Sequence, residues 1–276
     1  MKDYGGFDHN AQALRVLTKL EHRYPEFDGL NLTWESLEGV IKHNGPLVTK
    51  DKPLDSLPTA FRDYDALQSL GLDTFAGPEA QVAALADDIA YNNHDIQDGL
   101  RAGLFKIDDL KDVPLAGEVF QQVMKQYPDI ETDRVISESV RRLIGIWVKD
   151  LVAEFTRRAT AANPKSVEEV RALSHPLAAF SEDIAERQKP LRKFLFERMY
   201  RHHRVNRMMS QASRIVRELF ALFMSEPETL PPPWRDRAKA SDTTRRARIV
   251  CDYIAGMTDT YAIDEHRKLF NLERWG

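Results

Sequence analysis

An apolar stripe with helical spacing is the feature of this sequence that most restricts its fold. Between residues 134 and 162, apolar side chains recur every three or four positions, as Val140, Leu143, Ile144, Trp147, Leu151 and Phe155. That spacing places them on one side of an α-helix. No segment alternates apolar and polar residues as a half-buried strand does. Similar helical patterns cover residues 10–20, 33–43, 79–104 and 189–224. The sequence therefore predicts an all-α protein.

The last third of the chain contains one predicted break. Residues 227–242 include three consecutive prolines, and this composition predicts a loop or linker. One or two further helices, from Thr243 to Leu272, are predicted to close the chain.

The segment from Gln81 to Asp95 combines a helical apolar pattern with two adjacent carboxylates, Asp87 and Asp88. Asp87, Tyr91 and Asp95 are spaced four residues apart, and at roughly 100° per residue they share one helix face. A carboxylate buried on an apolar face must be paired, protonated or bound to a metal. The alternative is a surface helix whose Asp87 and Asp88 face water, and spacing alone does not separate the two.

Composition excludes several classes of function. The net charge of -4 gives no global argument for nucleic acid or an acidic membrane as partner. Cys251 is the only cysteine, so an intramolecular disulfide and a thiolate metal cluster are excluded. No apolar run approaches the length of about 18 to 20 residues that spans a bilayer, and no signal-peptide core is found. We therefore expect a cytoplasmic protein without a membrane partner.

Three groups of basic side chains have an ordinary structural explanation and a functional one. Residues 187–217 hold ten Lys or Arg against one acid, Glu197, an excess that suits polyphosphate, an acidic neighbouring subunit or only water. Lys42 and His43 end a predicted helix, where they favour the negative end of its dipole. Arg141 and Arg142 fall off the apolar stripe, which favours a solvated face.

Six short blocks, taken in order, resemble one protein family. They are residues 5–15 (GGFDHNAQALR), 42–46 (KHNGP), 86–91 (ADDIAY), 140–145 (VRRLIG), 196–202 (FERMYRH) and 252–259 (DYIAGMTD). Together they resemble the bacterial deoxyguanosine triphosphate triphosphohydrolase-like family of HD-domain phosphohydrolases. The resemblance runs essentially from end to end of the chain. It implies a multi-helix, HD-domain-like bundle.

The resemblance also implies an activity and a site. Family members cleave dGTP or another dNTP to the nucleoside and inorganic triphosphate with a divalent metal, such as Mn or Mg. By this resemblance Asp87 is the last metal ligand, Tyr91 contacts the phosphates, Asp95 contacts the sugar 3′-hydroxyl and His9 is catalytic, near the attacked phosphate. Further candidate contacts to triphosphate or base are Arg15, Lys42, His43, Arg141 and Arg142. A homo-oligomer is implied, and single-stranded nucleic acid is a candidate partner.

The chain also departs from the family pattern. The other metal ligands of the family, a histidine and a His-Asp doublet, precede the first block, and here only four residues do so. We therefore expect an N-terminally truncated bundle, with residues 1–110 as the C-terminal part of the HD catalytic domain and 111–276 as a helical region packed on it. A single aspartate binds a divalent ion weakly, so we expect this fragment to be inactive or nearly so. The alternative is a non-catalytic helical protein that binds nucleotide or a partner subunit through residues 187–217.

Overall fold

The computed structural model describes residues 1–271, and within them it contains helices and no β-strand. Extended backbone pairs there only as two isolated bridges, His22 with Gly29 and Thr49 with Lys52. The prediction of an all-α fold is confirmed. The α-helices are α1 (His9–Arg15), α2 (Trp34–Lys42), α3 (Thr59–Leu67), α4 (Pro78–Arg101), α5 (Ala116–Gln126), α6 (Thr132–Ala162), α7 (Val167–Arg171), α8 (Glu182–Leu195), α9 (His203–Ser225), α10 (Pro232–Lys239), α11 (Thr243–Ala255) and α12 (Asp259–Phe270).

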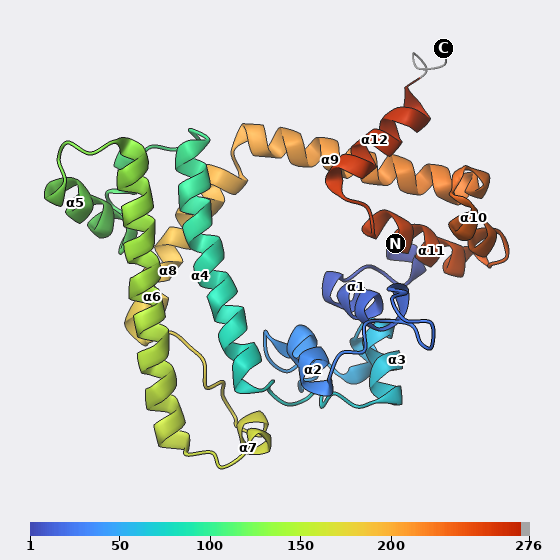
Figure 1. Ribbon diagram of the computed structural model, residues 1–276, viewed down its shortest axis with the longest axis horizontal. Coiled ribbons are helices and arrows are strands. Elements are labelled where there is room, and N and C mark those ends of the chain that lie inside the picture. The colour runs from blue at the N-terminus through green and yellow to red at the C-terminus, as the bar shows by residue number, and fades with distance from the viewer. Residues whose placement is uncertain (272–276) are drawn as a thin grey trace.

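The largest apolar core lies among α4, α5, α6 and α8, where α4 and α6 run side by side (Figure 1). The predicted stripe of α6 faces this core, and Leu143 and Trp147 have no exposed surface. Ile89 and Ile96 of α4 meet it from the other side. Since burying each large apolar side chain contributes about 1.5 to 3 kcal/mol, this packing holds α4 rigidly and with it the Asp87 face.

Two smaller cores lie at the two ends of the chain. The first joins α1, α2 and α3 through Leu14, Ile41 and Phe61. The other joins α9, α10 and α11, with Leu219 and Val250 fully buried. α9 extends from the α4–α6–α8 bundle to the α10–α12 group, and the N-terminus lies beside α11 (Figure 1). The chain thus forms a loop whose first and last thirds touch. The division into residues 1–110 and 111–276 stays a prediction.

Side-chain caps begin two of the helices near the groove described below. Asp8, directly before α1, accepts a hydrogen bond from the Ala11 amide at 2.8 Å and so caps the helix. Thr33 accepts one from the Ser36 amide at 3.3 Å at the start of α2. Each cap pairs an amide that the helix itself leaves without a partner, so both helices begin where the sequence indicates.

The predicted single helix over residues 189–224 is wrong, because the segment forms two helices. α8 continues into a π-helical turn, Phe196–Tyr200, and the chain then bends at Arg201. His202 starts α9 by accepting a hydrogen bond from the Arg204 amide at 3.3 Å. A π-turn adds a residue to the helical repeat and turns the following chain, so the apolar pattern alone does not reveal the bend.

Residues 227–242 are not only a loop, since they contain α10. Pro232 stands in the first turn of that helix, where an amide would have no helical partner, so the proline is tolerated there. The closing segment forms two helices, α11 and α12, and Leu272 lies outside the described residues. No helix of residues 1–271 is both long and apolar enough to cross a membrane.

Candidate functional site

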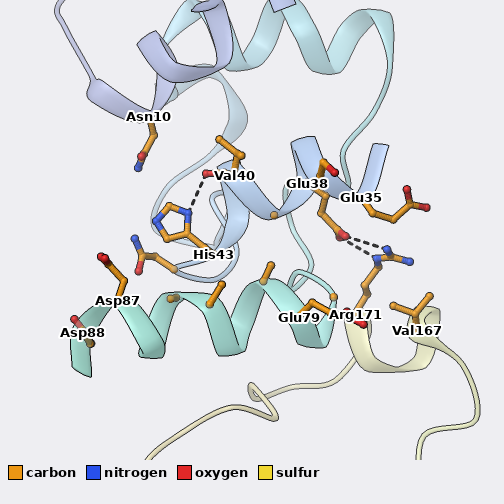
Figure 2. Close-up of a pocket in the computed structure, with 17 residues that line it drawn as sticks. Asn10, Glu35, Glu38, Val40, His43, Glu79, Asp87, Asp88, Val167 and Arg171 are labelled. Atoms are coloured by element: carbon orange, nitrogen blue, oxygen red, sulfur yellow. Dashed lines mark hydrogen bonds and ion pairs between the residues drawn. The ribbon is translucent and has the colours of Figure 1, made fainter. Parts of the chain in front are cut away.

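A groove of about 1050 Å³ lies between α2 and the first half of α4. Figure 2 shows Asn10 of α1, His43 and Asp87 around one end of it, and Arg171 of α7 at the other. Two of the predicted site residues, Asp87 and His43, therefore line a single space. They come from segments more than forty positions apart in the sequence, so the fold brings them together.

The two side chains present different chemical groups to the groove. The Asp87 carboxylate is exposed on α4, and Figure 2 shows it on the side of α4 that faces His43. His43 Nδ1 lies 2.9 Å from the Val40 carbonyl and donates to it, a tautomer we infer from that acceptor. No hydrogen bond is found for His43 Nε2 within residues 1–271, so this nitrogen is available to a ligand. Asp88 instead pairs with Arg192 of α8 at 2.8 Å and joins the two helices.

A buried ionic network lies at the Arg171 end of the groove. Glu38 accepts hydrogen bonds from Lys42 Nζ at 2.9 Å and from Arg171 Nε and Nη2, each at 2.9 Å. Lys42 Nζ also donates to the carbonyls of Leu70 and Gly71 and contacts the Thr74 hydroxyl at 2.9 Å. The amine of Lys42 is fully buried and has no donor left for a phosphate.

Burial and hydrogen bonding have opposite effects on the charges of this network. Burial by itself would raise the pKa of Glu38, but hydrogen bonds from Arg171 and Lys42 outweigh it and hold that pKa below its ordinary value. Burial lowers the pKa of Lys42, and Glu38 only partly opposes this. Arg171 also lies over the Trp34 ring, 4.7 Å from its centroid. The side chains at the Arg171 end of the groove are therefore held in place by ion pairs and hydrogen bonds among themselves.

The other two predicted residues of α4 lie farther along the helix. Tyr91 follows Asp87 by one turn and is 62% exposed. Asp95 is nearly buried and accepts a hydrogen bond from the Tyr200 hydroxyl of the π-turn. Burial, together with this hydrogen bond to Asp95, raises the pKa of Tyr200 well above its ordinary value. Tyr91 is thus open to a ligand, whereas Asp95 already has a protein partner.

His9 and Arg15 occupy the two ends of α1 and do not line the groove. His9 is exposed, and the next residue, Asn10, does line it. Arg15 is turned toward α11, where it forms an ion pair with Asp252. Gln12 donates a hydrogen bond to the same carboxylate at 3.1 Å. Of these two candidates on α1, only His9 is next in sequence to a residue that lines the groove, Asn10.

Arg141 and Arg142 lie on α6, outside the groove, and both bind Glu138. Hydrogen bonds from the two guanidinium groups lower the pKa of Glu138 to about 2. Arg142 also donates to the Gln126 side chain at 2.7 Å, and Arg141 is 72% exposed. The surroundings of Arg141 match the solvated helix face that the sequence pattern favours, whereas Arg142 is partly buried against Glu138 and Gln126.

The described residues do not fit a complete metal site. Within residues 1–271, no group of three or more His, Cys, Asp or Glu side chains is arranged to hold a metal ion. Asp87 contributes one carboxylate, and cation sites need several convergent ligands. A metal bound at Asp87 would need ligands that this part of the chain does not place beside it.

Sequence reasoning missed Asn10, Glu38 and Arg171 as residues of the groove. Asn10 follows His9 inside the first family-like block, so that block contained a signal for it. Glu38 and Arg171 are 133 positions apart, and no local pattern predicts their contact.

Comparisons with known proteins agree with the resemblance in the sequence. A family model described as a phosphohydrolase-associated domain matches residues 178–268. A deoxyguanosinetriphosphate triphosphohydrolase-like protein of Parvibaculum lavamentivorans is 59% identical over 99% of this chain and 69% of its own length. Proteins of the same description from Caulobacter vibrioides and Bradyrhizobium diazoefficiens are 58% and 49% identical, over 100% and 98% of this chain and 69% of their own lengths.

Proposed function

Since this chain belongs to the deoxyguanosinetriphosphate triphosphohydrolase-like family of HD-domain phosphohydrolases, we propose that it serves the hydrolysis of dGTP or another dNTP to nucleoside and triphosphate. The observation that carries the proposal is the meeting of Asp87 and His43 on one groove (Figure 2). A carboxylate and an imidazole that face the same space suit the attack of water on a phosphate. The substrate would lie along α4.

Each candidate residue takes a role that its surroundings allow. Because His43 Nδ1 already donates to Val40, His43 would donate through Nε2 to a phosphate oxygen only as the imidazolium, and exposed Tyr91 would donate its hydroxyl one turn along α4. Asp95 would accept a hydrogen bond from the sugar 3′-hydroxyl beside Tyr200, and His9 would donate to charge that develops on the attacked phosphate. Lys42 would act as a positioning residue, because its amine already holds Glu38, and Arg15 would do so through its ion pair with Asp252.

Asp87 is the proposed metal ligand, and its incomplete surroundings limit what the chain does alone. One carboxylate holds a divalent ion such as Mn²⁺ or Mg²⁺ weakly. We therefore propose that the 276-residue polypeptide binds dNTP but turns it over slowly or not at all. The Arg141 and Arg142 guanidinium groups, both engaged by Glu138, would contact only a part of the substrate that reaches beyond the groove.

A binding titration with matched variants tests the groove. We expect dGTP to bind the purified 276-residue chain, and His43→Gln to weaken binding about tenfold, since a hydrogen bond to a charged group is worth about 1.5 to 3 kcal/mol. His175→Gln is the control, because His175 is exposed and outside the groove. Equal affinities for wild type and His43→Gln would remove the groove from the proposal.

A turnover assay tests the metal assignment. Triphosphate release from dGTP with Mn²⁺ should stay near background in the 276-residue chain. In a preparation that is active, Asp87→Asn should abolish release, whereas Asp98→Asn, exposed on the same helix and outside the groove, should not. Full activity of Asp87→Asn would show that Asp87 is not a metal ligand.

A second candidate function rests on the exposed first half of α9. Met208 and Met209 are 64% and 61% exposed, on a helix that also carries Arg204 and Arg207. Exposed apolar side chains beside basic ones suit a contact surface for a second copy of the chain or for single-stranded nucleic acid. This non-catalytic alternative expects Met208→Ser to lower self-association in sedimentation experiments while the affinity for dGTP is unchanged.

A further inference from the structure

A second cavity, of about 470 Å³, lies in the seam between α1 and the α10–α11 pair. Its lining contains four arginines and a single carboxylate, that of Asp252. The arginines are Arg15, Arg237, Arg245 and Arg248. This cavity, which we call the arginine pocket, shares no lining residue with the groove between α2 and α4. It is therefore a separate place with a strong local excess of positive charge.

The carboxylate in the arginine pocket is already used by the protein. Asp252 pairs with Arg15 and accepts a hydrogen bond from Gln12. For Arg237, Arg245 and Arg248, no ion pair to a carboxylate is found within residues 1–271. Like charges gathered in one cavity repel each other, although water screens part of the repulsion here, because Arg237 and Arg245 are exposed and Arg248 is half-buried. An anion in the pocket would offset it.

Two of these arginines are held in place by neutral contacts. Arg237 lies over the Trp234 ring, 5.1 Å from its centroid, and Arg248 donates to the Gly6 carbonyl at 2.9 Å. Both contacts leave other guanidinium donors for a ligand, since an arginine carries five. A guanidinium that is already oriented loses less entropy when it binds an anion.

A larger cavity adjoins the arginine pocket and contains polar atoms that lack partners. It measures about 820 Å³ and shares Arg15, Arg245 and Arg248 with the arginine pocket. Gln12 lines it and is only 7% exposed. Gln12 Oε1 and Arg15 Nε are both buried and have no hydrogen-bond partner within residues 1–271. Buried polar atoms are paired in the great majority of cases, so a polar group that entered the seam beside these two would supply a missing partner.

We propose that the arginine pocket binds an oligophosphate anion, whose phosphates contact Arg237, Arg245 and Arg248. Guanidinium forks match phosphate oxygens in bidentate geometry, and three such groups suit an anion with several charges better than a single carboxylate or sulfate. Inorganic triphosphate and the triphosphate tail of a nucleotide share this chemistry. A nucleotide would place its remaining part in the adjoining cavity, which Gln12 lines. This inference does not depend on the function proposed for the groove.

Calorimetric titration of the 276-residue chain with inorganic triphosphate, in metal-free buffer, tests the proposal. We expect binding that is stronger than that of sulfate and that is weakened about tenfold by Arg245→Gln and by Arg237→Gln, since a charge-assisted hydrogen bond to each is lost. Arg235→Gln is the matched control, because Arg235 lies on α10, pairs with Asp236 and does not line the pocket. Circular dichroism melting shows whether each variant is folded.

The outcomes separate this site from the groove and the two ligand sources from each other. Loss of triphosphate binding in His43→Gln, with normal binding in the arginine variants, would assign the anion to the groove and overturn the proposal. Equal affinity for sulfate and triphosphate, or no binding at millimolar triphosphate, would overturn it too. If dGTP binds more tightly than inorganic triphosphate and depends on Arg245, the pocket holds the tail of a nucleotide. Equal affinities mean that it recognises the phosphate chain alone.

Discussion

Arg15 of α1 and Asp252 of α11 form an ion pair between residues 237 positions apart in the chain. The Asp252 side chain is 1% exposed and that of Arg15 is 23% exposed, so the pair lies largely buried between α1 and α11. Arg248 adds a hydrogen bond to the Gly6 carbonyl at 2.9 Å. These contacts join the N-terminal segment and α1 to α11, where the two ends of the loop meet in Figure 1.

Removing Arg15 should destabilise the protein. Arg15→Ala leaves the buried Asp252 carboxylate with Gln12 alone, and breaking a buried ion pair in this way costs about 3 to 5 kcal/mol. Urea unfolding measures the change. Arg23→Ala is the control, because Arg23 is 70% exposed and its pair with Glu21 contributes about 0 to 1 kcal/mol. Equal losses in the two variants would contradict a buried seam.

The buried network behind the groove should make stability depend on pH. The folded-state pKa of Glu38 lies below its ordinary value of 4.5, so its ionised form stabilises the fold above that pH. This contribution disappears as the pH falls through the folded-state pKa. Glu38→Gln should therefore cost about 3 kcal/mol at neutral pH and progressively less in acid. Urea midpoints over a pH series check this, and a constant difference would refute it.

Tyr91→Phe should weaken nucleotide binding without affecting the fold. Because Tyr91 is 62% exposed, the loss of its hydroxyl should change the free energy of unfolding by less than about 0.5 kcal/mol. A lost hydrogen bond to a phosphate should lower the affinity for dGTP about tenfold in calorimetry. Tyr127→Phe, 40% exposed and outside the groove, should bind like wild type.

Tyr200→Phe should loosen the π-turn from α4. Its hydroxyl donates to nearly buried Asp95, and a buried acceptor that loses its donor costs about 1 to 3 kcal/mol. Thermal unfolding measures this loss. Tyr64→Phe removes a hydroxyl that contacts the exposed Gln68 and should have almost no effect. A wild-type melting temperature for Tyr200→Phe would mean that the contact does not hold the turn.

Local patterns predicted most of the helices, because caps and apolar spacing are properties of neighbouring residues. The helical patterns predicted from residues 10 and 33 begin at helices capped by Asp8 and Thr33, and the stripe around Trp147 faces the main core. The bend at Arg201 was not predicted, because a single π-turn shifts the apolar repeat by only one residue and the segment still looks helical in sequence. The start of α10 at Pro232 was read as a loop, although proline also suits a first turn.

The site was predictable only in part. Asp87 and His43 came from family-like blocks, and the fold brings both to one groove. The contact of Glu38 with Arg171, and the turning of Arg15 toward Asp252, depend on pairings between distant segments. Such contacts follow from tertiary packing, which residue spacing does not encode. Lys42 is an example: a basic residue near a helix end suggests an exposed side chain, and nothing in the local sequence predicts that its amine is buried against the Leu70 and Gly71 carbonyls.

The loop arrangement gives the molecule two mechanical connections of unequal strength. α9 is a continuous helix that connects the main bundle to the α10–α12 group, whereas the seam is closed by non-covalent contacts such as the Arg15–Asp252 ion pair. If these non-covalent contacts opened, α9 would remain as the connection between the main bundle and the α10–α12 group. A molecule bound in the seam would therefore favour the closed arrangement of the loop, in which α1 contacts α11.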